Sequence, residues 1–393
     1  MTSQQQHVPA GARERLGKGP AEIQLMSKGD FDHRLDEMAA GRAPRDFFYG
    51  FLGLVEKGYD ARFQRTDRPY TGVSGAIATW RERLRARLTG FSERDRVLEE
   101  RADNWSRAKV MVSFTDHFSL TMGRVTKPMM VKPYTIGLFH GLSDIESRLP
   151  WLGRMTGYGH IWRSLAGLDH IGFFGPADRE QAIARYGLDR ERTSIFPFGV
   201  DTDFWCPGEE APAEKPFVLS VGSDPSRDFA TLVAAPVRAP VHIITRLPVV
   251  VPADRPNVTV MAGHYFKSPL DDVGLRRLYR QASVVVVTLK DVFQPTGYSV
   301  CLQAMACGRP VVLSDIRGLW APGLYVDGQH ARLVPPADPQ AMAAAINQLL
   351  DNPEMARRIG ENAQAVTLLN HRLETMDAAL ENLVCLAPGI TRR

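Results

Sequence analysis

The stretch VFQPTGYSVCLQAMACGRPVVLSD, residues 292–315, decides the fold. An apolar run of strand length, residues 284–289, precedes it. Pro295 and Gly297 predict a turn, and the residues after it predict a helix that ends near Gly308. Pro310 then opens another apolar run. This strand–turn–helix–strand order is the repeating unit of an open parallel α/β sheet.

The same alternation extends outward in both directions. Short Val- and Ile-rich runs alternate with helical patterns from residue 217 onward, and a similar series precedes residue 200. We therefore predict an α/β protein with two Rossmann-like parallel-sheet domains that face each other across a cleft. The expected divisions are a disordered tail over 1–20, an N-terminal domain over 21–205, a linker over 206–216, a C-terminal domain over 217–370, and a helix over 371–393 that crosses back to the first domain.

Composition excludes several classes of protein. The 393 residues carry a net charge of only +4, so no nucleic-acid partner is expected. Four cysteines without CxxC spacing predict neither a disulfide framework nor structural zinc. Because no long apolar run or secretion signal is present, we predict a cytoplasmic protein. The arginine-rich stretch 81–107 is compatible with a weak contact at the inner face of a membrane.

The predicted helix after residue 297 begins where a strand ends. Its first backbone N–H groups, around Gly297, Tyr298 and Ser299, lack partners within the helix and form a ready anion site, suited to a diphosphate. On geometry alone, a strand–turn–helix unit without any ligand is the commoner case.

Three segments together resemble a known family. Residues 292–315, TSIFPFGVDTDFWCPG (193–208) and LVPPADPQAMAAAINQLLDNP (333–353) are similar to the nucleotide-sugar half of family 4 glycosyltransferases of GT-B fold. The resemblance covers roughly residues 165–390. It implies transfer of a sugar from a nucleotide-diphosphate sugar to a hydroxyl acceptor, with retention of configuration and without a metal or other cofactor. The acceptor would be a glycan, a glycolipid or a small molecule.

The resemblance also implies roles for residues of the C-terminal half. Family members have two glutamates separated by seven residues, one near the donor sugar and one on the ribose. Here Gln303 stands at the ribose position, and Gln294 stands near the catalytic donor-sugar position, although eight residues separate the two. Ser223 replaces a phosphate-binding arginine, and Arg227 falls near a family lysine, so Arg227 would hold the diphosphate and stabilise the leaving group. Gly222, at the end of the preceding strand, would let the donor approach the backbone.

The N-terminal half contains two catalytic candidates, His140 and Asp116, and the acceptor candidates Tyr49, Gly50 and His117. His140 ends an apolar strand, where relatives keep a histidine near the donor sugar and acceptor. Asp116 and His117 follow an earlier strand and could bind or deprotonate the acceptor hydroxyl, or could simply cap a turn. Tyr49 and Gly50 lie where the family places an acceptor loop, although no doubled glycine is present.

Other functions remain as alternatives or lack their motifs. The missing glutamates leave open a non-catalytic nucleotide-sugar or glycan-binding protein, and the fold also serves phosphorylases and epimerases. Nicotinamide, P-loop, zinc-protease and serine-hydrolase motifs are absent from the sequence.

Overall fold

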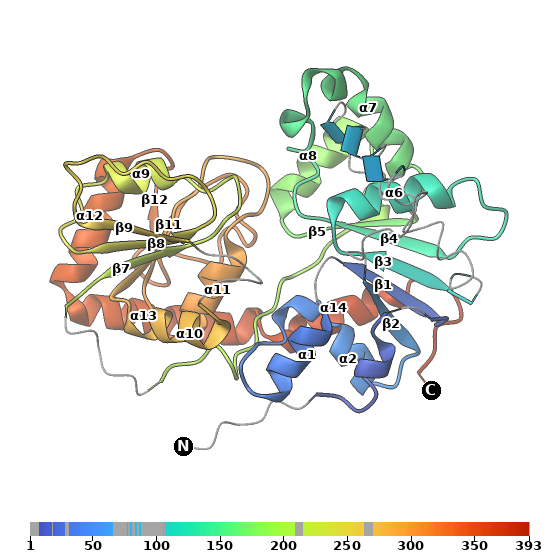
Figure 1. Cartoon of the computed structure of the whole chain (residues 1–393), viewed down its shortest axis with the longest axis horizontal. Helices are drawn as coiled ribbons and strands as arrows, with labels where there is room; N and C mark the ends of the chain where they lie inside the picture. The colour runs from blue at the N-terminus through green and yellow to red at the C-terminus, as the bar shows by residue number, and fades with distance from the viewer. Residues whose placement is uncertain are drawn as a thin grey trace. The chain divides into compact units, whose positions relative to one another are not determined.

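The computed structural model of the chain describes residues 8–17, 19–27, 31–65, 105, 107–208, 215–262 and 270–392, with positions 77, 79–80, 83–84 and 86–87. Contacts divide the chain into two compact units. The N-terminal unit contains residues 4–39, 47–197 and 376–393, and the C-terminal unit contains residues 40–46 and 198–375. Each unit is built on its own parallel sheet, which confirms the α/β fold (Figure 1).

The C-terminal unit has six described strands. They are β7 (Val218–Val221), β8 (Val241–Thr245), β9 (Val258–Ala262), β10 (Val284–Val287), β11 (Val311–Ser314) and β12 (Arg332–Val334). Their spatial order is β12-β11-β10-β7-β8-β9, with every pair parallel. The chain direction across the sheet therefore reverses between β7 and β10, the position where open α/β sheets bind ligands.

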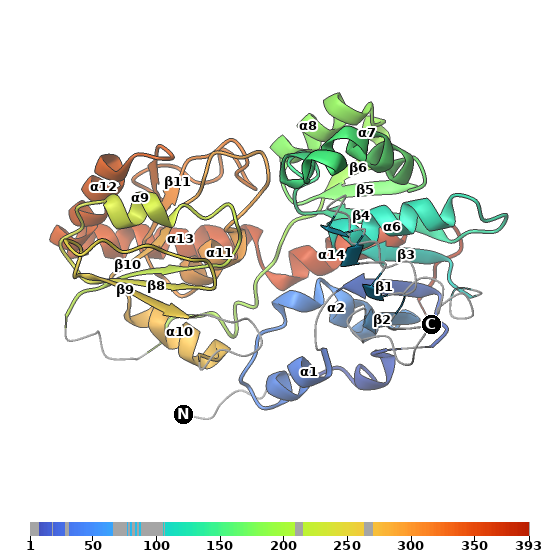
Figure 2. The ribbon, with the colours of Figure 1, turned by 45° about the horizontal axis from the view of Figure 1, so that its top comes forward.

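Helices cover both faces of this sheet. Those of the unit are α9 (Phe229–Ala234), α10 (Asp272–Gln281), α11 (Tyr298–Ala306), α12 (Pro339–Asp351) and α13 (Pro353–Asn370). Helices α9 and α12 lie on one face, and α10 and α11 lie on the other, with α13 packed on α11 (Figures 1 and 2). Val218, Val284 and Val312 pack with α9 and α12 in a fully buried apolar core. Burial of the strands on both faces explains their nearly continuous valine content.

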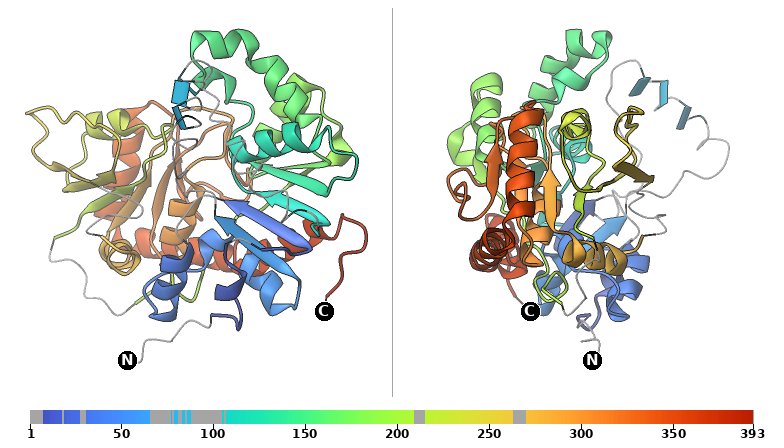
Figure 3. Two further views of the ribbon diagram at one scale, coloured as in Figure 1. Left: turned by 45° about the vertical axis from the view of Figure 1, so that its right-hand side comes forward. Right: turned by 90° about the vertical axis from the view of Figure 1, so that its left-hand side faces the viewer.

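The N-terminal unit also has six described parallel strands. They are β1 (Ile23–Ser27), β2 (Ala61–Arg65), β3 (Val110–Ser113), β4 (Tyr134–Phe139), β5 (His170–Phe173) and β6 (Thr193–Ile195), in the spatial order β2-β1-β3-β4-β5-β6. Its named helices are α1 (Phe31–Ala39), α2 (Phe51–Glu56), α6 (Asp116–Thr126), α7 (Trp151–Leu165), α8 (Pro176–Tyr186) and α14 (Leu373–Val384), whose first residues belong to the C-terminal unit. Helices α6, α7 and α8 share one face of the sheet (Figures 1 and 3).

Two glycines let α6 and the end of α7 approach closely. A Cβ atom on Gly123 would lie 2.0 Å from the carbonyl oxygen of Ser164, and one on Gly167 would lie 1.8 Å from the carbonyl oxygen of Gly123. Neither contact is sterically possible, so this helix pair requires glycine at both positions.

The units divide the chain differently from the predicted domains. The C-terminal unit begins at Phe198 rather than after the predicted linker, because Phe204 and Trp205 are buried within it. Residues 40–46 join the same unit. The predicted linker lies partly outside the described residues, which lack 209–214.

The first described segment and the last helix are both held within the N-terminal unit. Gly17 N–H donates to the carbonyl of Phe63 in β2, at 2.9 Å, so the described part of the predicted tail is held against the sheet. Residues 376–393 belong to the same unit. There Glu381 accepts hydrogen bonds from Lys57 at 2.5 Å and from the Tyr59 hydroxyl at 2.7 Å. Among the described helices, none combines the length and the apolar character needed to cross a bilayer.

Candidate functional site

The candidate donor residues gather at the carboxyl ends of β7 and β10. Gly222 directly follows β7, and Arg227 lies in the loop from β7 to α9. Gly297 caps α11, the helix that follows β10. Because β7 and β10 pair in parallel, both loops emerge at the same edge of the sheet. This edge is the reversal point of the strand order.

Arg227 is buried in this loop pair, with 5% of its surface exposed. Its Nε and Nη1 atoms meet no hydrogen-bond acceptor within the described part of the chain. Burial lowers the pKa of the guanidinium, and the nearby Asp224 carboxylate partly opposes that effect. A buried cation with unmet donors is costly unless an anion joins it.

Glycines line the space around this guanidinium. Gly222 has φ +146°, and a Cβ atom there would lie 2.3 Å from Arg227 Nε. Gly297 has φ +77°, and a Cβ atom there would lie 3.2 Å from Arg227 Nη1 and 2.7 Å from Val287 Cγ1. The guanidinium therefore lies beside the first turn of α11, whose N–H groups and dipole also favour an anion.

Hydrogen bonds fix the two loops to each other. Asp224 Oδ1 accepts from the backbone N–H of Ser226 at 2.8 Å and from the Thr296 hydroxyl at 3.2 Å. Lys290 N–H donates to the carbonyl of Ser226 at 2.9 Å, and Lys290 Nζ donates to the carbonyl of Pro225 at 3.0 Å. The position of Arg227 is thus set by both loops before any ligand arrives.

The other predicted donor residues have different surroundings. The Ser223 hydroxyl accepts from the backbone N–H of Arg246 at 2.9 Å. Tyr298 and Ser299 are half-buried in the first turn of α11, and the Tyr298 ring packs 4.9 Å from that of Phe198. Gln294 is buried at 5% exposure. Its role near the donor sugar stays a prediction.

Gln303 has a partner that the sequence did not suggest. Its Nε2 donates to Asp46 Oδ2 at 3.0 Å, and Trp205 Nε1 donates to the same oxygen at 2.8 Å. The backbone N–H of Asp201 donates to Asp46 Oδ1 at 2.6 Å. Asp46 comes from the 40–46 segment, so this distant stretch supplies a carboxylate to the end of α11.

Asp46 is fully buried, and its ionisation is strongly affected. Burial raises its pKa to about 7, with the nearby Asp201 adding to the rise and the three hydrogen bonds opposing it. In this contact Gln303 Nε2 faces the ionised Asp46 carboxylate, which leaves Oε1 on the other side of the amide. The ribose role of Gln303 stays a prediction, and Oε1 is the atom that could serve it.

In the N-terminal unit, three predicted residues meet at the ends of β3 and β4. The backbone N–H of His140 donates to Asp116 Oδ1 at 2.7 Å, and His140 Nε2 lies 2.9 Å from the carbonyl oxygen of Phe114. The His140 ring stacks on Phe174 at 4.2 Å. Tyr49, at φ +50°, stacks on Phe114 at 4.8 Å and lies edge-on to His140. Asp116, His140 and Tyr49 therefore form one group. The catalytic roles of Asp116 and His140 and the acceptor role of Tyr49 stay predictions.

Gly50 and His117 are less closely tied to this group. Gly50 has φ +88°, and a Cβ atom there would lie 3.0 Å from Leu380 of α14, so backbone conformation and packing together explain the glycine. His117 is exposed in the first turn of α6. Their acceptor roles stay predictions.

Asp178 is a second buried carboxylate that the sequence did not reveal. It accepts from the backbone N–H of Leu142 at 3.1 Å, and from the backbone N–H and hydroxyl of Ser143 at 2.7 and 2.5 Å. Burial raises its pKa to about 7 against these hydrogen bonds. Neither Asp46 nor Asp178 lies in a recognisable motif, because burial of a single acid depends on contacts distant in sequence.

An open cavity of about 440 Å³ lies elsewhere in the C-terminal unit. Its lining includes Ser283 and Pro310, which precede β10 and β11, so it lies at the opposite edge of the sheet from Arg227. Within the described ranges, no group of three or more His, Cys, Asp or Glu side chains could hold a metal ion.

Comparison with known proteins shows which family and which fold this chain resembles. Residues 246–352 match the family described as "Glycosyl transferases group 1". The MMP alpha-(1->4)-mannosyltransferase of Mycolicibacterium hassiacum is 27% identical over 197 residues, which cover 48% of this chain and 47% of the relative. The alpha-maltose-1-phosphate synthase of Mycobacterium tuberculosis is 30% identical over 256 residues, which cover 55% of this chain and 64% of that relative. The chain thus spans about half the length of the mannosyltransferase.

Solved structures match over nearly the whole chain. Sucrose-phosphate synthase from Thermosynechococcus elongatus has a TM-score of 0.66 at 18% identity, covering 94% of this chain and 99% of its own. Anabaena HepE in complex with UDP-glucose has a TM-score of 0.65 at 15% identity, covering 93% and 100%. Residues 246–352 therefore carry a group 1 glycosyl transferase domain, and the chain as a whole has the GT-B fold.

Proposed function

We propose that this chain is a glycosyltransferase that moves a sugar from a nucleotide-diphosphate sugar to a hydroxyl acceptor. The observation that carries the proposal is the buried Arg227 guanidinium, which has unmet N–H donors beside the N-terminus of α11. A diphosphate would satisfy these donors and the first N–H groups of the helix together.

The choice of donor rests on the relatives. HepE structures contain UDP and UDP-glucose, and the curated relatives include a mannosyltransferase and a kanosaminyltransferase. By analogy we infer a nucleoside-diphosphate hexose as donor. Gln303 Oε1 would accept from a ribose hydroxyl, and Gln294 would lie near the sugar.

Arg227 and the α11 N-terminus would stabilise the developing negative charge on the departing β-phosphate. Preorganised charge of this kind is usually the largest contribution to catalysis of group transfer. We propose retention of configuration from the family resemblance. We also propose metal independence, because a guanidinium and helix N–H groups can take the place of a metal at a diphosphate.

The acceptor would bind at the ends of β3 and β4. Asp116 is half-buried, and only its Oδ1 is bound, to His140 N–H, in the described structure. Its second oxygen could accept a hydrogen bond from an acceptor hydroxyl, with the Tyr49 and His140 rings beside it. The pathway would be the synthesis of a glycan, a glycolipid or a glycosylated metabolite.

A donor panel tests the proposal. Purified full chain is incubated with UDP-, GDP- and ADP-hexoses and with acceptor extracts, and nucleotide release and glycoside products are measured. Arg227→Ala should cost about 2 to 4 kcal/mol of transition-state stabilisation, and Arg358→Ala, at an exposed position of α13, serves as the control. Equal turnover in both variants would refute the assignment of Arg227.

The same panel separates the alternatives. Nucleotide binding without transfer to any acceptor would identify a binding protein that lacks activity, in keeping with the missing glutamates. Sugar phosphate formed from glycan and phosphate, or an epimerised donor without acceptor, would identify another reaction on this fold.

A further inference from the structure

Helix α7 of the N-terminal unit has a row of large apolar side chains exposed to solvent. Trp151, Met155, Tyr158 and Trp162 are 69, 75, 46 and 48% exposed. At 100° per residue these four positions fall within about 60° of the helix circumference. The buried side of α7 contains Ile161 and Leu165, which pack in the core with α6 and α8. The exposed row is therefore not a part of the core.

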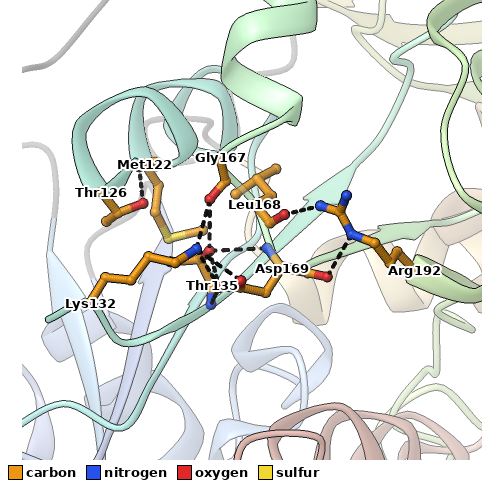
Figure 4. Close-up of polar contacts among 8 residues, drawn as sticks. All are labelled: Met122, Thr126, Lys132, Thr135, Gly167, Leu168, Asp169 and Arg192. Carbon is orange, nitrogen blue, oxygen red and sulfur yellow. Dashed lines mark hydrogen bonds and ion pairs between the residues drawn. The ribbon is translucent and has the colours of Figure 1, made fainter. Parts of the chain in front are cut away.

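The loop between α6 and β4 exposes apolar groups at the end of the same helix. Met130 is fully exposed, and Val131 is 87% exposed. The next residue, Lys132, donates through Nζ to Asp169 at 2.8 Å and to the carbonyl of Gly167, just past α7, at 3.3 Å. Figure 4 shows Lys132 reaching Gly167 and Asp169. This contact fixes the loop beside the C-terminal end of α7.

The charged residues of these two segments have one sign. Helix α7 contains Arg154 and Arg163 and no Asp or Glu. Residues 117–132, which include the exposed loop, contain Lys127, Arg124 and Lys132 and no acid. Arg154 is bound to the backbone carbonyls of Ser147 and Leu149 rather than to a carboxylate. Because Lys132 is paired with the Asp169 carboxylate, the complementarity of this surface to negative charge rests on the exposed Lys127 and Arg163.

Isolated exposed apolar residues need no explanation, but a contiguous group on one helix indicates a binding surface. In the C-terminal unit Val250, 86% exposed, is isolated in this sense, and Leu369, 79% exposed, adjoins Leu368 at 38%. Trp and Tyr are favoured at the boundary between water and lipid, where an apolar ring and a polar edge are both satisfied. Basic side chains beside them are attracted to anionic headgroups.

We propose that the α7 surface, defined as Trp151, Met155, Tyr158, Trp162, Met130 and Val131, docks on an anionic lipid bilayer. The helix would lie along the interface with its aromatic row among the headgroups, and Lys127 and Arg163 would contact lipid phosphates. This proposal does not depend on glycosyl transfer. It also does not use the arginine-rich stretch 81–107, most of which lies outside the described residues.

Vesicle sedimentation tests this surface directly. Full chain is mixed with vesicles of phosphatidylcholine alone and with vesicles that contain phosphatidylglycerol. The expected result is sedimentation with the anionic vesicles, reduced by salt. Trp151→Ser/Trp162→Ser should weaken the partition coefficient at least about tenfold. Lys127→Glu/Arg163→Glu should abolish the preference for anionic lipid.

The matched control is Val250→Ser/Leu369→Ser, which removes two exposed apolar side chains from the other unit. Circular dichroism checks that each variant is folded. Wild-type chain that stays in the supernatant, or a tryptophan variant that sediments like wild type, would overturn the proposal. A concentration-dependent dimer that the tryptophan variant loses, without any lipid binding, would show that a second copy of the chain occupies this surface instead.

Discussion

Replacing Arg227 with methionine should raise the stability of the free protein and weaken its binding of nucleotide. Methionine keeps most of the aliphatic volume but removes a buried charge whose Nε and Nη1 lack acceptors in the described structure. Each unmet buried donor costs about 1 to 2 kcal/mol, and the poorer packing of a shorter side chain beside Gly222 and Gly297 offsets about 1 kcal/mol. The free energy of unfolding of the C-terminal unit should therefore rise by about 1 to 3 kcal/mol.

Added nucleotide should make the wild-type protein more stable than Arg227→Met. A ligand at one hundred times its dissociation constant stabilises the state that binds it by about 2.7 kcal/mol. Wild-type protein should gain about this amount from UDP or from another nucleoside diphosphate that it binds. Arg227→Met should gain little, because the variant presents no cation to the diphosphate. Such opposite effects on the free and the bound protein are typical of a binding site whose residues suit the ligand and, without it, lower the stability of the folded protein.

Urea unfolding with and without nucleotide provides the measurement. Because the chain has two units, amide hydrogen exchange within β7 and β10 should accompany it, so that the change is assigned to the C-terminal unit. Arg358→Met, at an exposed position of α13 in the same unit, is the control. A variant that is destabilised by several kcal/mol without ligand, yet is stabilised by nucleotide as much as wild type, would show that Arg227 is a structural residue.

Substitutions at glycine, glutamine and aspartate positions test other parts of the two units. Gly222→Ala should weaken nucleotide binding about tenfold in calorimetry, since its Cβ atom would lie 2.3 Å from Arg227 Nε; unchanged affinity would contradict the arrangement. Gln303→Glu should destabilise the protein by about 3 to 5 kcal/mol at pH 8, and clearly less at pH 5, because it places a carboxylate against Asp46; equal losses at both pH values in urea unfolding would contradict this. Asp46 and Asp178 have folded pKa values of about 7 against 3.8, so the folded state binds more protons between these values, and stability should fall as pH rises from about 4 to about 7. The fall in the free energy of unfolding is at most on the order of 4 kcal/mol for each group, and Asp178→Asn should make the dependence of stability on pH less steep. Stability that rises with pH over this range would show that these two carboxyl groups do not have raised pKa values in the folded protein.

The sheets could be predicted from the sequence because their signals are local. A strand of consecutive valines, such as residues 284–287, is buried on both faces, so its composition alone indicates its place. Gly297 marks the start of α11 for a similarly local reason, since its φ of +77° favours glycine. Such local signals are enough to predict that Gly222, Arg227 and Gly297 follow the carboxyl ends of strands, where the structure places them.

The surroundings of the site could not be predicted in the same way. The sequence around Gln303 predicts a helix residue that faces a ligand, whereas its contact with Asp46 joins positions 257 residues apart. The apolar row on α7 is equally hidden, because Trp, Met and Tyr at helical spacing predict a buried face as readily as an exposed one. The helical spacing shows that these side chains share one face of the helix, but only the packed structure shows whether that face is buried or exposed.

The route of the chain has a consequence for experiments on separated halves. The Asp46 segment belongs with residues 198–375, and residues 376–393 belong with the N-terminal unit. A cut after residue 197 would therefore leave the Trp205 indole N–H and the Gln303 amide without their carboxylate, and would take Glu381 away from Lys57 and Tyr59. Each fragment should be poorly folded alone, whereas the two fragments produced together should complement each other.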